Sequence, residues 1–195
     1  MYTIKNNYTN EIIIKNSRFI TALYKVKTID EIENYLKNIK DIYKDATHYC
    51  YAYILDNIKK CSDDGEPSGT AGIPIIQVLE KNNLNYILCI IIRYFGGIKL
   101  GSNGLIRAYS KCTSNALIKD NLIELEKGYN IDITFNYDNL NNINYLLKDE
   151  IILNKEFNES ITYNLDVNKK LLDKLNLLNY NIINIKEKLI EKNKN

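Results

Sequence analysis

A chain of 195 residues, 45% of them hydrophobic and 26% charged, is long enough for one large or two small globular domains and differs from a long disordered chain. Its net charge of +2 argues against nucleic-acid binding by bulk electrostatics alone and is compatible only with a local basic patch. Neither a signal peptide nor an apolar run of membrane-span length is found, so we expect a cytoplasmic protein with no membrane partner.

The first elements are predicted to form a meander and a helix. Strands are expected at residues 2–5, 11–14 and 18–26, where apolar, aromatic and β-branched residues lie between polar connections. Thr28 and Glu31 have the spacing of a capping box. They precede apolar residues at i, i+3, i+4 and i+7, which give a helix one buried face.

Two glycine-rich loops interrupt the elements that follow. A tyrosine-rich strand at 47–55 leads to the acidic segment, residues 62–72, and a short helix is expected from Thr70. An almost wholly apolar run at 84–95 is typical of a central strand buried on both faces. It leads through the glycine loop, residues 96–104, into a helix at about 103–119. Seven of the eight glycines and both prolines belong to this part of the chain.

A second domain is expected at residues 128–195, after a first at 1–127. Its elements follow the ferredoxin-like order βαββαβ, at residues 129–136, 138–148, 151–157, 160–167, 168–178 and 181–189. Asp138 is predicted to cap the first of these helices. This half has no glycine-rich loop, histidine or cysteine, which favours a recognition or supporting role over catalysis.

The glycine loop has the order strand, glycines, helix that is typical of an anion site. Glycines let backbone N–H groups turn toward a ligand, and a new helix adds unpaired N–H groups and the positive end of its dipole. The predicted phosphate-binding residues are Arg93, Gly96, Gly97, Lys99, Gly101, Ser102, Asn103, Gly104 and Arg107. The spacing matches neither a Walker loop nor a dinucleotide fingerprint. The alternative is a tight turn that lets a helix pack closely on the strand.

The acidic segment places three carboxylates, those of Asp63, Asp64 and Glu66, within one turn. Together they can hold Mg²⁺ with phosphate oxygens completing the shell, which makes them weak candidates for a metal site. The favoured interpretation is a solvated or salt-bridged turn, with the bridge running to Arg93 or Arg107. The segment from Glu66 to Thr70 is expected to cap the following helix.

His48 is the only histidine and begins the strand that leads to the acidic segment. As a general base it needs an orienting carboxylate, which Asp63 or Asp64 can provide, so these three are the candidate catalytic residues. If His48 is only a structural residue at the edge of a strand, it needs no orienting carboxylate. The four cysteines lack the close spacing of a zinc or redox site and are predicted to be reduced thiols.

Four motifs together resemble one family. They lie at residues 16–19 (NSRF), 46–50 (ATHYC), 62–74 (SDDGEPSGTAGIP) and 93–109 (RYFGGIKLGSNGLIRAY). Their order and spacing are similar to those of the IMPACT family in its bacterial, YigZ-like form, over about residues 16–118.

The resemblance implies an α+β fold of two domains. The first would be a β3αβαβα domain with a left-handed βαβ unit, like the second domain of a small-subunit ribosomal protein. The second would be ferredoxin-like, similar to domains of elongation factor G. The translational role of eukaryotic members depends on an extra N-terminal domain and is not carried over, and kinase activity is not expected.

These observations leave three functional hypotheses. The leading one is a non-enzymatic, translation-associated protein that binds RNA or ribosomal phosphates through Arg93, Lys99, Arg107 and the glycine loop, with no cofactor. The second is a Mg²⁺-assisted enzyme that acts on a phosphorylated small molecule, with His48 as base. The third is a protein-interaction scaffold. The sequence does not predict the oligomeric state.

Overall fold

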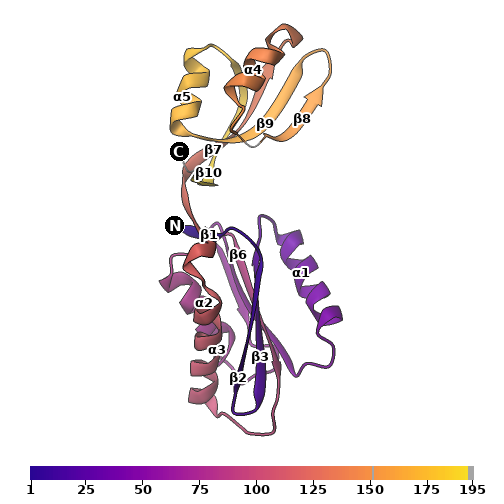
Figure 1. Ribbon diagram of the computed structural model, residues 1–195, viewed down its shortest axis with the longest axis vertical. Helices are drawn as coiled ribbons and strands as arrows, with labels where there is room; N and C mark the ends of the chain where they lie inside the picture. The colour runs from indigo at the N-terminus through magenta and orange to yellow at the C-terminus, as the bar shows by residue number, and fades with distance from the viewer. Residues whose placement is uncertain (151, 193–195) are drawn as a thin grey trace. The chain divides into compact units, whose positions relative to one another are not determined.

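The computed structural model describes residues 1–150 and 152–192, which divide into two compact units, Met1–Glu124 and Leu125–Asn195 (Figure 1). The first residue of the strand predicted at 151–157 and the end of the chain lie outside the described residues. Among those described, no helix is long and apolar enough to cross a membrane.

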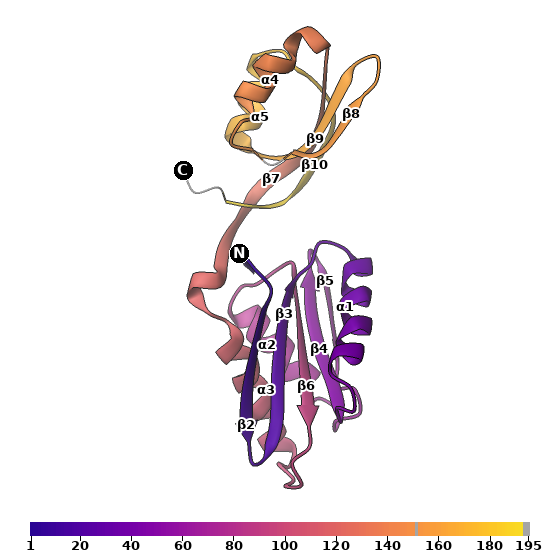
Figure 2. The ribbon, with the colours of Figure 1, turned by 45° about the vertical axis from the view of Figure 1, so that its right-hand side comes forward.

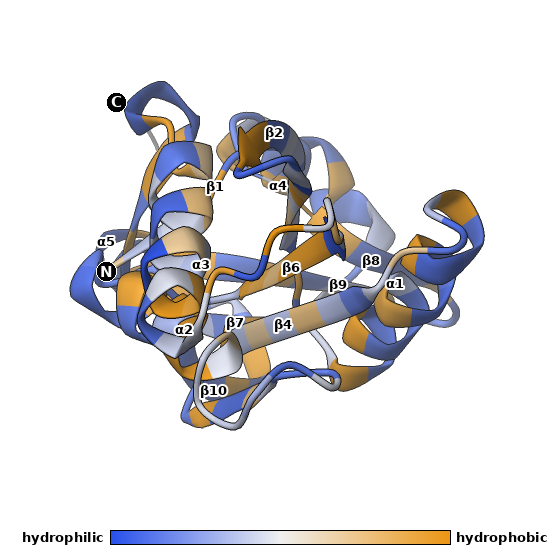
Figure 3. Ribbon diagram, turned by 90° about the horizontal axis from the view of Figure 1, so that it is seen from below, coloured by the Kyte–Doolittle hydropathy of each residue, from blue (hydrophilic) through white to orange (hydrophobic). Residues whose placement is uncertain are grey.

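The first unit is built on a five-stranded sheet in the order β2-β3-β6-β4-β5, in which all neighbours are antiparallel. Its strands are β2 (Tyr8–Ile14), β3 (Ser17–Lys25), β4 (His48–Leu55), β5 (Ile58–Ser62) and β6 (Ile87–Tyr94). The apolar run predicted to be a doubly buried strand is the central β6, whose residues from Ile87 to Ile92 are fully buried. Figure 3 shows that this strand is coloured mostly as hydrophobic.

Helices cover both faces of this sheet. α1 (Ile29–Ile42) packs on one face, and α2 (Gly72–Lys81) and α3 (Ser102–Ala116) pack side by side on the other (Figure 1). The predicted capping box of α1 is confirmed in part, because the Thr28 side chain accepts a hydrogen bond from the Glu31 N–H (3.2 Å).

Two strands of this unit differ from the prediction. β1 (Tyr2–Ile4) leaves the expected meander and pairs with Leu122–Glu124, at the other end of the unit. β5 was not predicted, since its lysine-rich segment has no apolar alternation; it forms the edge of the sheet beside β4. β1 is defined by a distant partner, whereas β5 forms a tight hairpin with β4, in which Leu55 lies opposite Ile58.

The second unit has the predicted order of elements. Its elements are, in chain order, β7 (Leu122–Phe135), α4 (Leu140–Leu146), β8 (Ile152–Phe157), β9 (Ile161–Asn168), α5 (Lys169–Leu177) and β10 (Asn181–Glu191). The four strands form a sheet in the order β10-β7-β9-β8 (Figure 2). α4 and α5 contribute to a core on one face of this sheet. The chain is therefore an α+β protein with two sheets.

The junction and one helix start depart from expectation. The predicted boundary at residue 128 falls inside β7, which is continuous from Leu122. The two compact units meet in sequence between Glu124 and Leu125. Gly128 permits close strand approach there, because a Cβ atom would lie 2.7 Å from the Val167 carbonyl oxygen. Asp138 does not cap α4: it lies in a 3₁₀ turn, and Asn139 at the N-cap makes no side-chain bond.

Candidate functional site

The sheet of the first unit brings the sequence motifs together at one of its ends. On the face covered by α2 and α3, His48 at the start of β4 lies opposite Arg93 near the end of β6, and Phe19 lies opposite Arg93 on the other side. β5 ends at the same edge, opposite Tyr51. The acidic segment and the glycine loop therefore leave the sheet at one end, and each leads into a helix.

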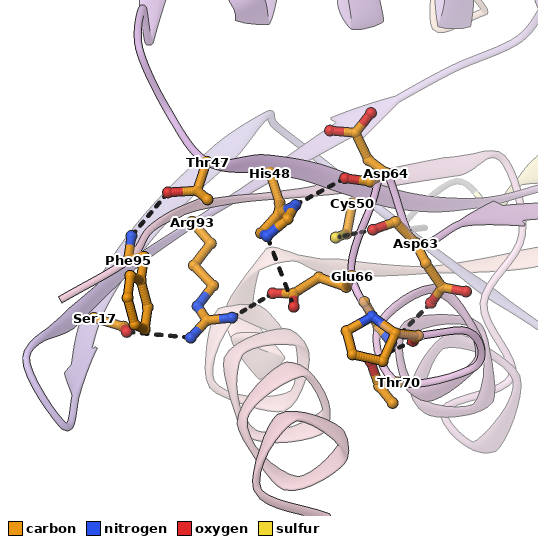
Figure 4. A network of polar contacts seen from close by, with 12 residues as sticks. Ser17, Thr47, His48, Cys50, Asp63, Asp64, Glu66, Thr70, Arg93 and Phe95 are labelled. Carbon is orange, nitrogen blue, oxygen red and sulfur yellow. Dashed lines mark hydrogen bonds and ion pairs between the residues drawn. The ribbon is translucent and has the colours of Figure 1, made fainter. Parts of the chain in front are cut away.

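A buried ion pair lies at the centre of this end of the sheet (Figure 4). Arg93 donates from Nη1 to Glu66 Oε1 (2.5 Å), and the Tyr109 hydroxyl of α3 donates to the same oxygen (2.8 Å). The two charged side chains are only 5% and 3% exposed. The predicted salt bridge from the acidic segment to Arg93 is thus confirmed. Arg107 takes no part in it.

Arg93 also joins the start of β3 to the glycine loop. Its Nη2 donates to Ser17 Oγ (3.3 Å), which accepts a second bond from the Gly96 N–H (3.2 Å). The guanidinium lies over the rings of Phe19 (5.3 Å) and Phe95 (5.6 Å). With Nη1 and Nη2 engaged inside the protein, Arg93 is placed to organise the site rather than to meet a ligand directly.

His48 is oriented by a different group from the one expected. Its Nδ1 lies 2.8 Å from the Asp64 carbonyl oxygen, which can only accept, so Nδ1 carries the hydrogen. Nε2 is 3.8 Å from Glu66 Oε2. The predicted orienting carboxylate of Asp63 or Asp64 is wrong, because both of those carboxylates bind backbone N–H groups instead.

Asp63 ties the acidic segment to the first turn of α2. Its carboxylate accepts from the N–H groups of Gly69 (2.8 Å), Ala71 (2.9 Å) and Gly72 (2.9 Å). Partial burial alone would raise the pKa of Asp63, but these three donors outweigh it and hold the pKa below its usual value. The cap of α2 is therefore Asp63 rather than the predicted segment from Glu66 to Thr70.

The three carboxylates of the acidic segment do not converge as a metal site requires. Asp63 binds the start of α2, Asp64 Oδ2 accepts from the Tyr49 N–H (2.7 Å), and Glu66 is paired with Arg93. Across residues 1–150 and 152–192, no group of three or more His, Cys, Asp or Glu side chains is arranged to hold a metal ion. The weak candidacy of Asp63, Asp64 and Glu66 as metal ligands is thus corrected, because backbone and guanidinium donors occupy their oxygens.

The neighbouring thiol and phenol are held in their neutral forms. Cys50 Sγ donates to the Asp63 carbonyl oxygen (2.9 Å) and lies 3.3 Å from the Tyr109 hydroxyl. Burial raises the pKa of Cys50 to about 12 and raises that of Tyr109 further. Neither side chain is suited to act as a nucleophile or base near neutral pH.

Two different structural reasons explain why glycine occupies its positions in the glycine loop. A Cβ atom on Gly96 would lie 2.0 Å from the backbone of Asn16, so the β2–β3 turn can approach only a glycine there. Gly97 (φ 83°) and Gly101 (φ 70°) have left-handed backbone conformations with nothing within 4 Å of a Cβ position. Close packing thus accounts for Gly96, and backbone conformation accounts for the other two.

The N-terminus of α3 differs from that of α2 because no side chain caps it. Gly101 stands at the N-cap position, and the first turn contains no acidic residue. Ser102 and Asn103 are exposed there, as are Lys99 before the helix and Arg107 within it. Neither cation has an ion pair in the described part of the chain. The structure thus separates the predicted ligand set into a buried Arg93 and this exposed group.

Several residues of the site were not identified from the sequence. Ser17 and Tyr109 complete the Arg93–Glu66 network from elements far along the chain, and both lie in the family motifs, which is the only signal that pointed to them. Lys15 and Phe95 are exposed beside the glycine loop. Lys15 reaches it because the Lys15–Asn16 turn, with φ values of 45° and 64°, packs against Gly96.

Comparison with known proteins agrees with this arrangement of motifs. The Impact N-terminal domain model matches residues 15–117, which include both loops and the ion pair. The IMPACT family member YvyE of Bacillus subtilis is 39% identical over 174 residues, 87% of this chain and 80% of that protein. The chain belongs to the IMPACT family. It is a bacterial member of the YvyE and YigZ type.

Other members of the IMPACT family match a smaller share of the chain. YigZ of Escherichia coli K12 is 37% identical over 109 residues, which cover 53% of each protein. The crystal structure of a hypothetical protein is similar over both units, with a TM-score of 0.66 and 26% identity, covering 95% of this chain and 97% of that one. The fold described above is therefore shared along the whole chain with a solved structure.

Proposed function

We propose that this IMPACT family member is a translation-associated protein that binds RNA, including ribosomal RNA, through phosphates received at the glycine loop. The observation that carries the proposal is the uncapped N-terminus of α3, where unpaired N–H groups and the positive end of the helix dipole meet the exposed cations Lys99 and Arg107. Lys15 in the adjoining turn adds a third positive charge.

Charge around the loop also favours a polyanion. Residues 93–107 contain three features that attract anions, namely the exposed Lys99 and Arg107 and the start of α3, and no Asp or Glu. The chain as a whole is nearly neutral, so a partner would be held by this local patch and not by long-range attraction. The expected likeness of both units to domains of translation proteins favours RNA over a small phosphorylated metabolite.

The metal-assisted alternative loses its chemical basis in the described structure. Its three carboxylates are engaged with backbone N–H groups and with Arg93, and His48 faces a buried carboxylate. A protein-interaction scaffold remains the outcome to expect if association with ribosomes survives nuclease treatment.

The salt dependence of RNA binding tests this proposal. Removing two phosphate contacts with the double variant Lys99→Ala/Arg107→Ala should lower the slope of log affinity against log salt by about two. The matched control Lys37→Ala/Lys119→Ala removes two exposed lysines elsewhere in the same unit and should leave the slope nearly unchanged. If neither filter binding nor ribosome sedimentation detects association at low salt, the proposal fails.

A further inference from the structure

Phe95 is an exposed aromatic side chain at the end of the central strand. It follows β6 directly, and its backbone N–H donates to Thr47 Oγ1 (3.0 Å) at the start of the neighbouring strand. The residue is nevertheless 46% exposed. One exposed ring needs no explanation by itself, and what distinguishes Phe95 is its contact with the buried guanidinium of Arg93.

The ring of Phe95 is supported from within the protein. The Arg93 guanidinium lies over it (Figure 4), and the same guanidinium also lies over the ring of Phe19. Glu66 and Ser17 hold the guanidinium in place through its two terminal nitrogens. The buried network thereby presents an aromatic surface at the edge of the glycine loop.

A nucleobase is the partner that this surface suits. Every base has a flat π face that stacks on an aromatic ring whatever its identity, and single-strand binding proteins combine such rings with a positively charged path for the backbone. Here the ring is followed in the same loop by Lys99 and by the uncapped start of α3. The absence of carboxylates from residues 93–107 removes the repulsion that a nucleic acid would otherwise meet.

We propose that Phe95 stacks on an unpaired base of single-stranded RNA while a phosphate of the same strand is bound at the start of α3. This inference rests on the proposed function and narrows it, because bases paired inside a duplex are already stacked and cannot reach the ring. Single-stranded or looped RNA is therefore the preferred partner, and sequence preference is weak.

Replacing the ring tests stacking directly. Phe95→Ala should weaken binding of a single-stranded oligonucleotide by about tenfold, within the range typical of one stacked base, and should leave binding of a duplex of equal length unchanged. Ile98→Ala is the matched control, since Ile98 is an equally exposed apolar residue of the same loop (45%). Equal losses from both variants would overturn stacking, because they would indicate general apolar contact.

A second variant gives a spectroscopic signal that a structural effect cannot mimic. The chain has no tryptophan, so Phe95→Trp introduces a single tryptophan at the proposed contact, whose emission can be excited apart from that of the 16 tyrosines. Its emission should be quenched on titration with single-stranded RNA and not with an abasic strand of the same length, while affinity stays near that of the parent protein.

The outcomes separate the two proposals. If Phe95→Ala binds single strands as tightly as the parent while Lys99→Ala/Arg107→Ala binds them weakly, stacking is wrong and the phosphate site stands. If the parent protein binds neither single strands nor duplexes at low salt, both proposals fail. Quenching by single-stranded RNA, without quenching by the abasic strand, supports both proposals.

Discussion

The two units differ in how far water reaches their networks of polar side chains. In the first, Arg93 and Glu66 form one buried ion pair at the end of the sheet, surrounded by Ser17, Tyr109 and His48. In the second, Asn and Asp side chains form a half-exposed ladder across β7, β9 and β10 on the face away from the core. A polar group is difficult to replace where water is excluded, and easier to replace where water can take over its bonds.

The ladder of the second unit consists of amides that bind each other and the flanking carboxylates. Asn130 and Asn164 exchange hydrogen bonds, Asn164 also donates to Asp132 (2.6 Å), and Asn184 donates to the other oxygen of Asp132 (2.6 Å). Most of these bonds remain partly accessible to solvent. The contrast indicates that the network around Glu66 determines a site, whereas the ladder mainly supports a sheet surface.

The largest effect is expected from removing one member of the buried ion pair. Glu66→Ala leaves the Arg93 guanidinium buried without its carboxylate, and should lower the free energy of unfolding of the first unit by about 3–5 kcal/mol. Hydrogen exchange resolved by residue checks this, because protection should fall in β6 and stay unchanged in β9. An equal loss in both units would contradict the assignment of the network to one unit.

A smaller effect, with a defined pH dependence, is expected at Asp63. Asp63→Ala removes the acceptor of three backbone donors and should cost about 1–3 kcal/mol at neutral pH. Because folding lowers the pKa of Asp63, its stabilisation is complete above the unfolded pKa of about 4 and is lost as pH falls through the lower folded value.

Acid titration of stability separates the charge of Asp63 from its shape. Asp63→Asn keeps the side-chain size but removes the titrating group, so the stability of the variant should depend less on pH below about 4 than that of the parent protein. Parallel acid-unfolding curves for the two proteins would show that the carboxylate charge is not what holds the start of α2.

The smallest effect is expected in the ladder. Asn164→Ala removes hydrogen bonds to Asn130 and Asp132, but water can replace part of them, so the second unit should lose about 1 kcal/mol or less. Urea unfolding followed by a probe in that unit measures the change. A loss as large as that of Glu66→Ala would remove the contrast between the two networks.

Much of the fold could be predicted because local patterns determine it. The capping residues of α1, the doubly apolar β6 and the order of elements in the second unit all follow from spacing along short segments. The partner of β1 could not be predicted, since its pairing depends on contacts between distant residues. β5 forms a hairpin with the strand before it and was missed because its lysine-rich segment has no apolar alternation.

The site could be predicted in outline and not in detail. Glycine content and the position of the arginines located the two loops. A salt bridge from the acidic segment to Arg93 was one of the interpretations that the sequence allowed. What local spacing could not show is that Arg93 would be buried, because that depends on Tyr109 arriving from α3 and Ser17 from β3. Nor could it show that Asp63 would bind three N–H groups, since these converge only after the acidic segment has folded.

The pairing of β1 with Leu122–Glu124 has a consequence for biosynthesis. Ile4 and Thr3 are fully buried, and the Lys5 N–H donates to the Asn121 carbonyl oxygen (2.7 Å), so the first residues translated find their antiparallel partner only near the end of the unit. A nascent chain halted before residue 121 would keep the contacts of Tyr2 with Asn83 and Asn85 but would lack the antiparallel partner of β1. Pairing of β1 on that side is therefore completed only after residue 124 has been synthesised.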